Sequence, residues 1–290
     1  MKTISNSQIS IKVSPLGAEL CSIFANGKEY LWQADPAFWK RHSPVLFPIV
    51  GSLWENEYRI EGTAYTLTQH GFARDMTFTL ISEEADELRY RLISNTETLA
   101  KYPYPFCLEI GYRLHNKQIE VMWEVKNTGE KEMFFQIGAH PAFYWPDFEE
   151  TTQERGYFGF DKKDNFKYIL ISEKGCADPS TEYTMALSDE LLPLDTHTFD
   201  KDALIIENSQ IKTVTLYNRK KKACLSLHFT APVVGLWSPP EKNAPFICIE
   251  PWYGRCDWAH YTGEYKDKDW MQHLQAGETF KGGYTIEINE

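Results

Sequence analysis

The chain has 290 residues, of which 42% are hydrophobic and 24% charged, a composition sufficient for a globular protein with a substantial core. Its formal net charge of −11 disfavours nucleic acid and anionic membrane surfaces as partners. The N-terminus lacks an apolar signal core, and no stretch approaches the run of about eighteen apolar residues that indicates a membrane span.

The six cysteines are scattered and form no C-x-x-C pair and no Cys/His zinc spacing. Several lie in apolar, strand-like runs, as in Phe246-Ile247-Cys248-Ile249. We therefore expect reduced, buried thiols in a cytoplasmic protein, with no metal and no cofactor. The cysteines are Cys21, Cys107, Cys176, Cys224, Cys248 and Cys256.

Strand and turn patterns dominate the chain from its start. Ile9, Ile11 and Val13 alternate with polar residues, and Asn26-Gly27 predicts a hairpin turn between strands at 20–24 and 29–32, because both residues tolerate positive φ. Residues 106–114 and 119–125 both keep period two, which predicts a long antiparallel hairpin with one buried face.

The second half continues in the same style. Further strands are expected at 203–206, 214–217, 225–229, 234–237, 246–250 and 284–288. The basic run 218–222 is interpreted as a solvated hairpin tip, and 149–200 as long loops with short strands. Helix is expected only at 268–274, with one turn at 36–40. The prediction is an all-β antiparallel sandwich forming a single domain over residues 1–290.

One stretch near the middle combines features of a ligand site. A strand-like run, 133–137, leads through Gly138 and Ala139 to His140, and aromatic residues including Phe143 follow. A histidine at a strand end beside flat apolar faces suits a sugar ring. The alternative is a core histidine with a satisfied hydrogen bond.

Two other stretches add polar residues at strand ends. His70 and Arg74 precede an expected strand at 76–80. Glu250 ends an almost wholly apolar strand, with Pro251 expected to stop the ladder and Trp252 to supply a flat face. Desolvation would raise the pKa of this carboxyl and make it a useful general base. The alternative is a buried ion pair with Arg74 or Arg255.

Together these residues supply the acid and base groups that interconversion of sugar anomers requires. A base takes the proton of the C1 hydroxyl while an acid protonates the ring oxygen, the ring opens, and the same groups close it with the opposite configuration. Unperturbed pKa values predict a bell-shaped rate profile, with an acidic limb from the carboxylate base and a basic limb from the histidine that acts as the acid.

The three motifs, residues 70–74, 138–143 and 250–252, resemble those of the aldose 1-epimerase (mutarotase) family, most closely its lactose-operon-associated branch. The resemblance runs from about Ile9 to Ile288 and implies a galactose mutarotase-like β-supersandwich. By the same resemblance, Glu250 matches the general base, His140 the general acid and His70 a second histidine near the ring oxygen. Arg74 matches an arginine that holds hydroxyls, and Asp202 lies at about the place of a substrate-binding aspartate.

The sequence does not identify which sugar is the substrate. Related hexose-6-phosphate epimerases carry an arginine directly before a Pro-Val-x-aromatic-Pro run, and here Arg41 stands one residue out of step before residues 44–48. We expect Arg41, Trp252 and Phe143 to contact the substrate. The alternatives to a free-hexose epimerase are a hexose-6-phosphate 1-epimerase and a non-catalytic carbohydrate-binding or sensing protein. The protein is expected to be a monomer or a homodimer.

Overall fold

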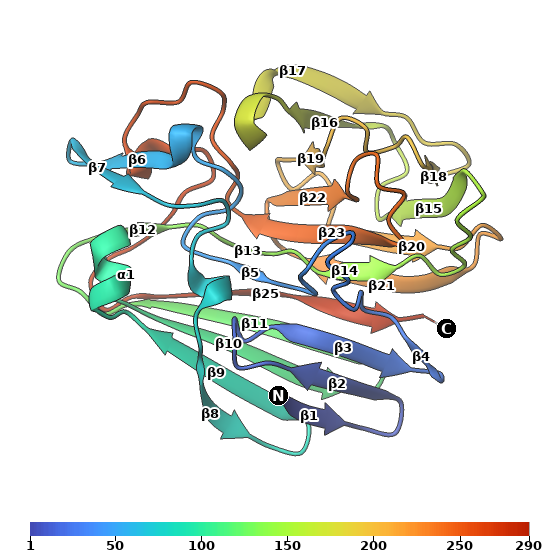
Figure 1. The fold of residues 1–290 in the computed structure, drawn as a ribbon, viewed down its shortest axis with the longest axis horizontal. Coiled ribbons are helices and arrows are strands. Elements are labelled where there is room, and N and C mark those ends of the chain that lie inside the picture. The colour runs from blue at the N-terminus through green and yellow to red at the C-terminus, as the bar shows by residue number, and fades with distance from the viewer. Residues whose placement is uncertain (290) are drawn as a thin grey trace.

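Antiparallel strands build almost the whole protein, as a computed structural model that describes residues 1–289 shows (Figure 1). The single α-helix among these residues is α1 (Thr96–Lys101), and no helix in the described part of the chain is long and apolar enough to cross a membrane. The side chain of Asn95 caps α1 by accepting the backbone N–H of Thr98. The predicted all-β fold with very little helix is confirmed.

A nine-stranded sheet has the predicted hairpin near its centre. In that hairpin Phe106 pairs with Asn127 and His115 with Gln118, and buried positions alternate with partly exposed ones on both strands. In spatial order the strands are β18 (Leu191–Asp195), β15 (Glu154–Phe160), β20 (Thr213–Tyr217), β21 (Ala223–Phe229), β25 (Thr279–Ile288), β11 (Gln118–Asn127), β10 (Phe106–His115), β9 (Glu87–Ile93) and β8 (Thr79–Glu83).

An eight-stranded sheet packs on this one and carries the candidate site. Its path is β17 (Ala177–Met185), β16 (Phe166–Ile171), β19 (Leu204–Ile206), β22 (Val233–Trp237), β23 (Phe246–Tyr253), β13 (Ile137–Ala139) and β5 (Val45–Leu46), with β14 (Ala142–Tyr144) also paired to β23. Ile247 and Ile249 of β23 join the same core cluster as Leu216 and Leu227 of the nine-stranded sheet. Because side chains alternate along a strand, the even-numbered residues of β23 point to the opposite face.

Three smaller sheets complete the fold. They are β1 (Lys2–Ser5), β2 (Ile9–Val13), β3 (Leu20–Ala25) and β4 (Lys28–Glu29); β6 (Glu57–Ile60) with β7 (Thr63–Thr66); and β12 (Met133–Phe135) with β24 (Gln272–Leu274). The Tyr112 hydroxyl of β10 donates to the Ala18 carbonyl at 2.7 Å, which ties the N-terminal sheet to the large one. Four 3₁₀ turns cover Trp54–Asn56, Ala73–Asp75, Glu173–Gly175 and Tyr265–Asp267.

Local sequence predicted three turns that the structure contains. Asn26 and Gly27 have φ values of 52° and 77° and join β3 to β4. The basic run 218–222 is the tip between β20 and β21. Residues 36–38 form one hydrogen-bonded turn, as expected.

Two predictions about regular structure were wrong. Residues 268–274 do not form a helix: the segment ends in β24, whose Leu274 pairs with Met133 of β12. Residues 149–200 contain four strands of five to nine residues rather than mainly loops. In both cases strand pairing decides the conformation, which local composition does not report.

Pro251 does not end its strand, contrary to expectation. It pairs with Val234, and β23 continues to Tyr253, so Glu250 lies within the strand rather than at its end. The N–H of Ile249 points to the carbonyl of Pro141, and the nitrogen of Pro251 lies on that same side two residues later. There β13 and β14 leave a break in the sheet, so the missing N–H removes no ladder bond.

Candidate active site

Glu250 projects from the middle of β23 on the face away from the main core. The residue is only 1% exposed. It forms no ion pair with Arg74 or Arg255; Arg255 instead pairs with Glu207 at 2.6 Å and with Asp269. The structure therefore does not support the predicted ion pair of Glu250 with an arginine. A histidine side chain lies beside its carboxyl oxygen instead.

His140 occupies the break between β13 and β14, directly beside Glu250. Its backbone N–H donates to the Pro44 carbonyl at 3.1 Å, and its Nε2 lies 3.3 Å from Glu250 Oε2. The imidazole stacks on Trp39, with centroids 4.6 Å apart, and meets the ring of Trp237 edge-on at 5.3 Å. These contacts place the His140 imidazole between two indole rings and next to the Glu250 carboxyl group.

His70 approaches from a turn on the other side of His140, with ring centroids 5.5 Å apart. The Gly51 N–H donates to His70 Nδ1 at 3.0 Å, and the His70 N–H donates to the Gly51 carbonyl at 2.9 Å. Because Nδ1 accepts, the neutral ring carries its proton on Nε2. His70 is therefore built as a hydrogen-bond donor through Nε2.

A cavity of about 300 Å³ contains these three groups. It is large enough for a monosaccharide, and its walls combine indole rings with polar side chains. The lining residues are Gly51, Gln69, His70, His140, Ile171, Gly175, Asp202, Ala203, Trp237, Glu250, Trp252 and Cys256.

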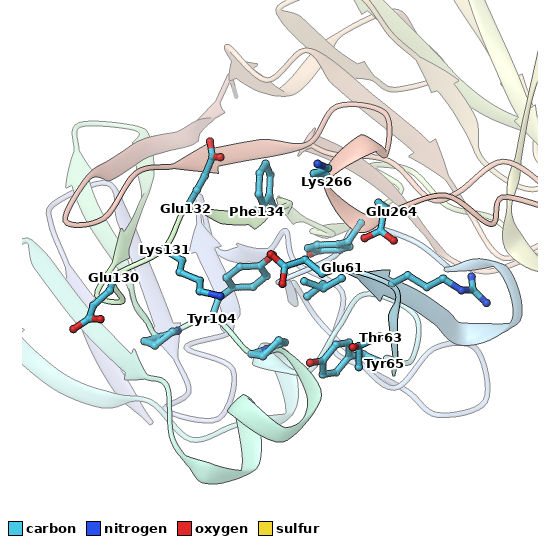
Figure 2. Close-up of a pocket in the computed structure, with 15 residues that line it drawn as sticks. Glu61, Thr63, Tyr65, Tyr104, Glu130, Lys131, Glu132, Phe134, Glu264 and Lys266 are labelled. Carbon is cyan, nitrogen blue, oxygen red and sulfur yellow. The ribbon is translucent and has the colours of Figure 1, made fainter.

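A larger hollow of about 570 Å³ lies elsewhere, between the β6–β7 hairpin, β12 and residues 264–266 (Figure 2). Aromatic residues such as Tyr104 and Phe134 and charged residues such as Glu61 and Lys131 line it. Its lining residues include no histidine and therefore no carboxylate–imidazole pair. The smaller cavity is the one equipped for proton transfer.

Burial shifts the pKa values of the acid–base pair in opposite directions. Loss of hydration, reinforced by the charge of Asp202, raises the pKa of Glu250 well above its usual value, and the Trp252 indole opposes this in part. Loss of hydration and then the charge of Arg74 lower the pKa of His140 to about 3. Burial therefore favours an uncharged carboxyl and an uncharged imidazole, which together hold one transferable proton.

His70 is uncharged for the same reason. Burial first, and then the nearby His140, Arg74 and Arg41, lower its pKa well below the usual value. This agrees with the Nδ1 acceptor geometry, because a protonated ring has no acceptor nitrogen for the Gly51 N–H.

The two arginines lie behind the cavity lining and share a carboxylate. The Arg41 guanidinium lies 2.9 Å from Asp75, and Arg74 Nε lies 3.8 Å from the same side chain. Arg74 also donates to the Gln69 carbonyl at 2.6 Å, while burial lowers its pKa to about 10. Neither arginine is among the residues that line the cavity.

Of the other residues named from the sequence, Asp202 and Trp252 line the cavity and Phe143 does not. Phe143 is fully buried in the main core and pairs with Ile247, so its expected contact with the substrate is not supported by its position. The alternation along β14 explains this, since Phe143 faces the core between the sheets.

Sequence reasoning missed Trp39 and Trp237, the two rings that enclose His140. Trp237 ends a predicted strand, β22, and its place opposite Cys248 was readable only once β22 and β23 were paired. Trp39 lies in an irregular segment with no periodic pattern, so the sequence offered no signal for it.

A family model, that of aldose 1-epimerase, matches residues 1–287. The chain belongs to the aldose 1-epimerase family. This confirms the resemblance drawn from the three motifs and places the protein among isomerases of carbohydrates.

Individual relatives are similar over almost the entire chain. Protein LacX (plasmid) of Lactococcus lactis subsp. lactis is 33% identical, covering 98% of each chain. A solved galactose mutarotase related enzyme from Lactobacillus acidophilus is 34% identical with a TM-score of 0.93, covering 100% of this chain and 97% of that one. A galactose mutarotase-like protein from Lactobacillus casei is 29% identical with a TM-score of 0.91, covering both chains fully. The fold of this family member is therefore galactose mutarotase-like.

Proposed function

We propose that the protein is an aldose 1-epimerase that interconverts the α and β anomers of a hexose. The observation that carries the proposal is the 3.3 Å approach of His140 Nε2 to Glu250 Oε2 within the aromatic cavity. A buried carboxyl group beside an imidazole, with one proton to transfer, supplies the acid and the base that ring opening requires.

In the proposed reaction, a bound sugar places its C1 hydroxyl at Glu250 and its ring oxygen at His140. With the pair in its charged form, Glu250 takes the proton of the C1 hydroxyl while His140 gives its proton to the ring oxygen, and the bond from C1 to the ring oxygen breaks. Rotation about the C1–C2 bond followed by the reverse transfers gives the other anomer. Ring opening leaves an uncharged carboxyl and imidazole, which is the form that burial favours.

The remaining cavity residues are given binding roles. The Nε2–H of His70 is a donor for the ring-oxygen region, and Asp202 is an acceptor for sugar hydroxyls. The faces of Trp237 and Trp252 suit the apolar faces of a pyranose ring. The buried Nε1–H of Trp252 makes no hydrogen bond of ordinary geometry among the described residues, although it lies close enough to Glu250 to oppose the rise of its pKa, so a sugar oxygen could take it as a donor.

The test is the rate of anomer interconversion, followed by polarimetry or by NMR exchange, for galactose, glucose and other free hexoses. Acceleration over the buffer rate that disappears in Glu250→Gln supports the proposal. Tight binding of a sugar with no acceleration of any hexose or hexose phosphate would contradict it and favour a carbohydrate-binding protein.

A hexose 6-phosphate is the second candidate substrate, because Arg41 and Arg74 meet at Asp75 close enough to the site to lower the pKa of His70. Guanidinium groups offer planar donor pairs that match phosphate. Under this alternative, Arg74→Ala raises KM for the phosphorylated sugar much more than for the free sugar. An equal effect on both sugars would assign Arg74 to hydroxyls or to the Asp75 contact alone.

A further inference from the structure

Cys248 is a buried thiol that the proposed reaction does not use. It lies two residues before Glu250 on the same face of β23 and is fully buried. It pairs with Ala142, two residues beyond His140, so pairing with β14 brings the thiol next to the imidazole.

These three side chains converge on one point. One ligand atom from each of His140, Cys248 and Glu250 lies within 4.8 Å of the other two, and the nitrogen–oxygen pair is only 3.3 Å apart. Glu250 Oε2 is buried and has no hydrogen-bond partner among the described residues. The cluster thus brings an imidazole nitrogen, a thiol and a carboxyl oxygen without a hydrogen-bond partner within 4.8 Å of one another.

Nitrogen, sulfur and oxygen are the ligands that Zn²⁺ takes in proteins, at roughly 2.0–2.3 Å from the ion. Around a tetrahedral ion of that size, the ligand atoms stand roughly 3.3–3.8 Å from one another. Small side-chain movements therefore bring the three groups to zinc-binding distances. Mg²⁺ and Ca²⁺ prefer oxygen ligands alone and match the cluster poorly.

We propose that His140, Cys248 and Glu250 form a Zn²⁺ site that inhibits the enzyme by occupying its acid–base pair. The ion takes the lone pairs of the nitrogen and the carboxylate that proton transfer needs. The thiol proton of Cys248 and the carboxyl proton of Glu250 leave to solvent, and the fourth position is left for a further ligand such as water. The inhibitory part of this proposal rests on the proposed function, whereas the metal site itself does not.

The sequence predicted no metal site because its residues carry no zinc spacing. Cys248 and Glu250 are separated by a single residue, a spacing that matches no common zinc motif. His140 lies more than a hundred positions earlier in the chain. A second cluster, Glu19, Cys21 and His42, also brings its ligand atoms within 4.8 Å. There one carboxylate oxygen of Glu19 already accepts the backbone N–H groups of His42 and Ser43, at 2.9 and 3.0 Å.

Direct metal binding is measured first, on the whole protein. Co²⁺, used as a spectroscopic stand-in for Zn²⁺, should give a thiolate-to-cobalt charge-transfer band, and calorimetry should give Zn²⁺ affinity. Cys248→Ala should abolish the band and weaken Zn²⁺ at least tenfold, since loss of an outer-shell partner alone costs about 10- to 100-fold. Cys248→Ser keeps the volume and should also lose the band. Cys21→Ala is the control and should retain both.

Inhibition is measured next, as the Zn²⁺ concentration that halves the mutarotation rate. Cys248→Ala should keep the wild-type rate without metal and need at least about tenfold more Zn²⁺ for half inhibition. A band that survives in both Cys248 variants and disappears in Cys21→Ala would overturn the proposal in favour of the second cluster. Absence of the band in folded wild type would overturn it too. A Cys248-dependent band in a protein with no mutarotase activity would preserve the metal site and refute the proposed function instead.

Discussion

At the scale of single residues, burial is the main cause of the pKa shifts on which the proposed chemistry depends. The same loss of hydration raises the pKa of Glu250 and lowers that of His140, because each shift favours the uncharged form. The sequence identified both residues and expected the raised carboxyl pKa. It assigned His140 an ordinary pKa, since nothing in the local sequence shows that His140 is 7% exposed.

This difference changes the expected pH–rate profile. As pH falls through about 3, His140 takes up a second transferable proton for the pair and the rate should fall; as pH rises through the raised pKa of Glu250, the pair loses its one transferable proton and the rate should fall again. We expect a plateau between the two limbs, both of which belong to the coupled pair. His140→Asn should remove most of the rate, and His70→Asn less. An acidic limb near about 4.3 together with a basic limb near about 6.5, the ordinary values of a Glu and a His, would contradict this account.

Replacing Glu250 by glutamine tests the base directly. The amide keeps the shape of the side chain but cannot accept the proton of the C1 hydroxyl. We expect kcat to fall by more than about a hundredfold, the low end for loss of general-base catalysis, with an unchanged circular dichroism spectrum. Near-native turnover by Glu250→Gln would remove Glu250 from the reaction.

At the scale of elements, the turn that carries His70 depends on a glycine. Gly71 has φ of +69°, and a Cβ there would lie 2.3 Å from the Phe47 carbonyl oxygen. Gly71→Ala must therefore displace either the residue 47 backbone or His70. We expect a loss of at least about 1 kcal/mol in the free energy of unfolding together with a lower kcat/KM.

Gly62 offers a matched control for that substitution. It has φ of +76° in the β6–β7 hairpin, and a Cβ there would meet no atom within 4 Å among the described residues. Gly62→Ala should carry a similar backbone cost and leave kcat/KM unchanged. Equal loss of activity in both variants would show that Gly71 affects stability alone.

Element by element, the sequence predicted those strands whose burial alternates. The hairpin of β10 and β11 was evident because one face of each strand is buried and the other is partly exposed. The strand β24 was mistaken for helix because its three residues gain their conformation from pairing with β12. Pro251 was taken as a strand end because the break between β13 and β14 that accommodates it is a property of the sheet.

At the scale of the whole molecule, the candidate site lies on one face of the eight-stranded sheet, and the other face packs against the nine-stranded sheet. Ile247 and Ile249 of β23 fill the core between the sheets, whereas Cys248, Glu250 and Trp252 are buried on the opposite face. The motifs indicated candidate site residues, but only strand pairing brings His140 to Glu250. The same pairing adds Cys248 and excludes Phe143, and neither outcome was available from spacing along the chain.

The cavity wall also depends on a buried ion pair that joins distant segments. Lys268 pairs with Asp257, both side chains being 2% exposed, and the other Asp257 oxygen accepts the Trp54 N–H at 2.9 Å. The Asp257 N–H donates to the Ser52 carbonyl at 2.9 Å, so this residue anchors the segment beside Gly51 and the end of β23.

Lys268→Met should therefore be strongly destabilising although it is far from the proposed chemistry. The methionine fills similar space but leaves the Asp257 carboxylate buried without its cation, a change that costs about 3–5 kcal/mol in comparable pairs. Lys163→Met is the control, because Lys163 pairs with Glu190 at 2.8 Å with both side chains more than half exposed, and it should change stability far less. Burial lowers the pKa of Lys268 to about 7, so urea unfolding of the wild type and both variants is compared at about pH 6, where Lys268 is charged. Equal midpoints for the two variants would mean that Asp257 finds water or another partner when Lys268 is lost, and that the pair does not hold this wall of the cavity.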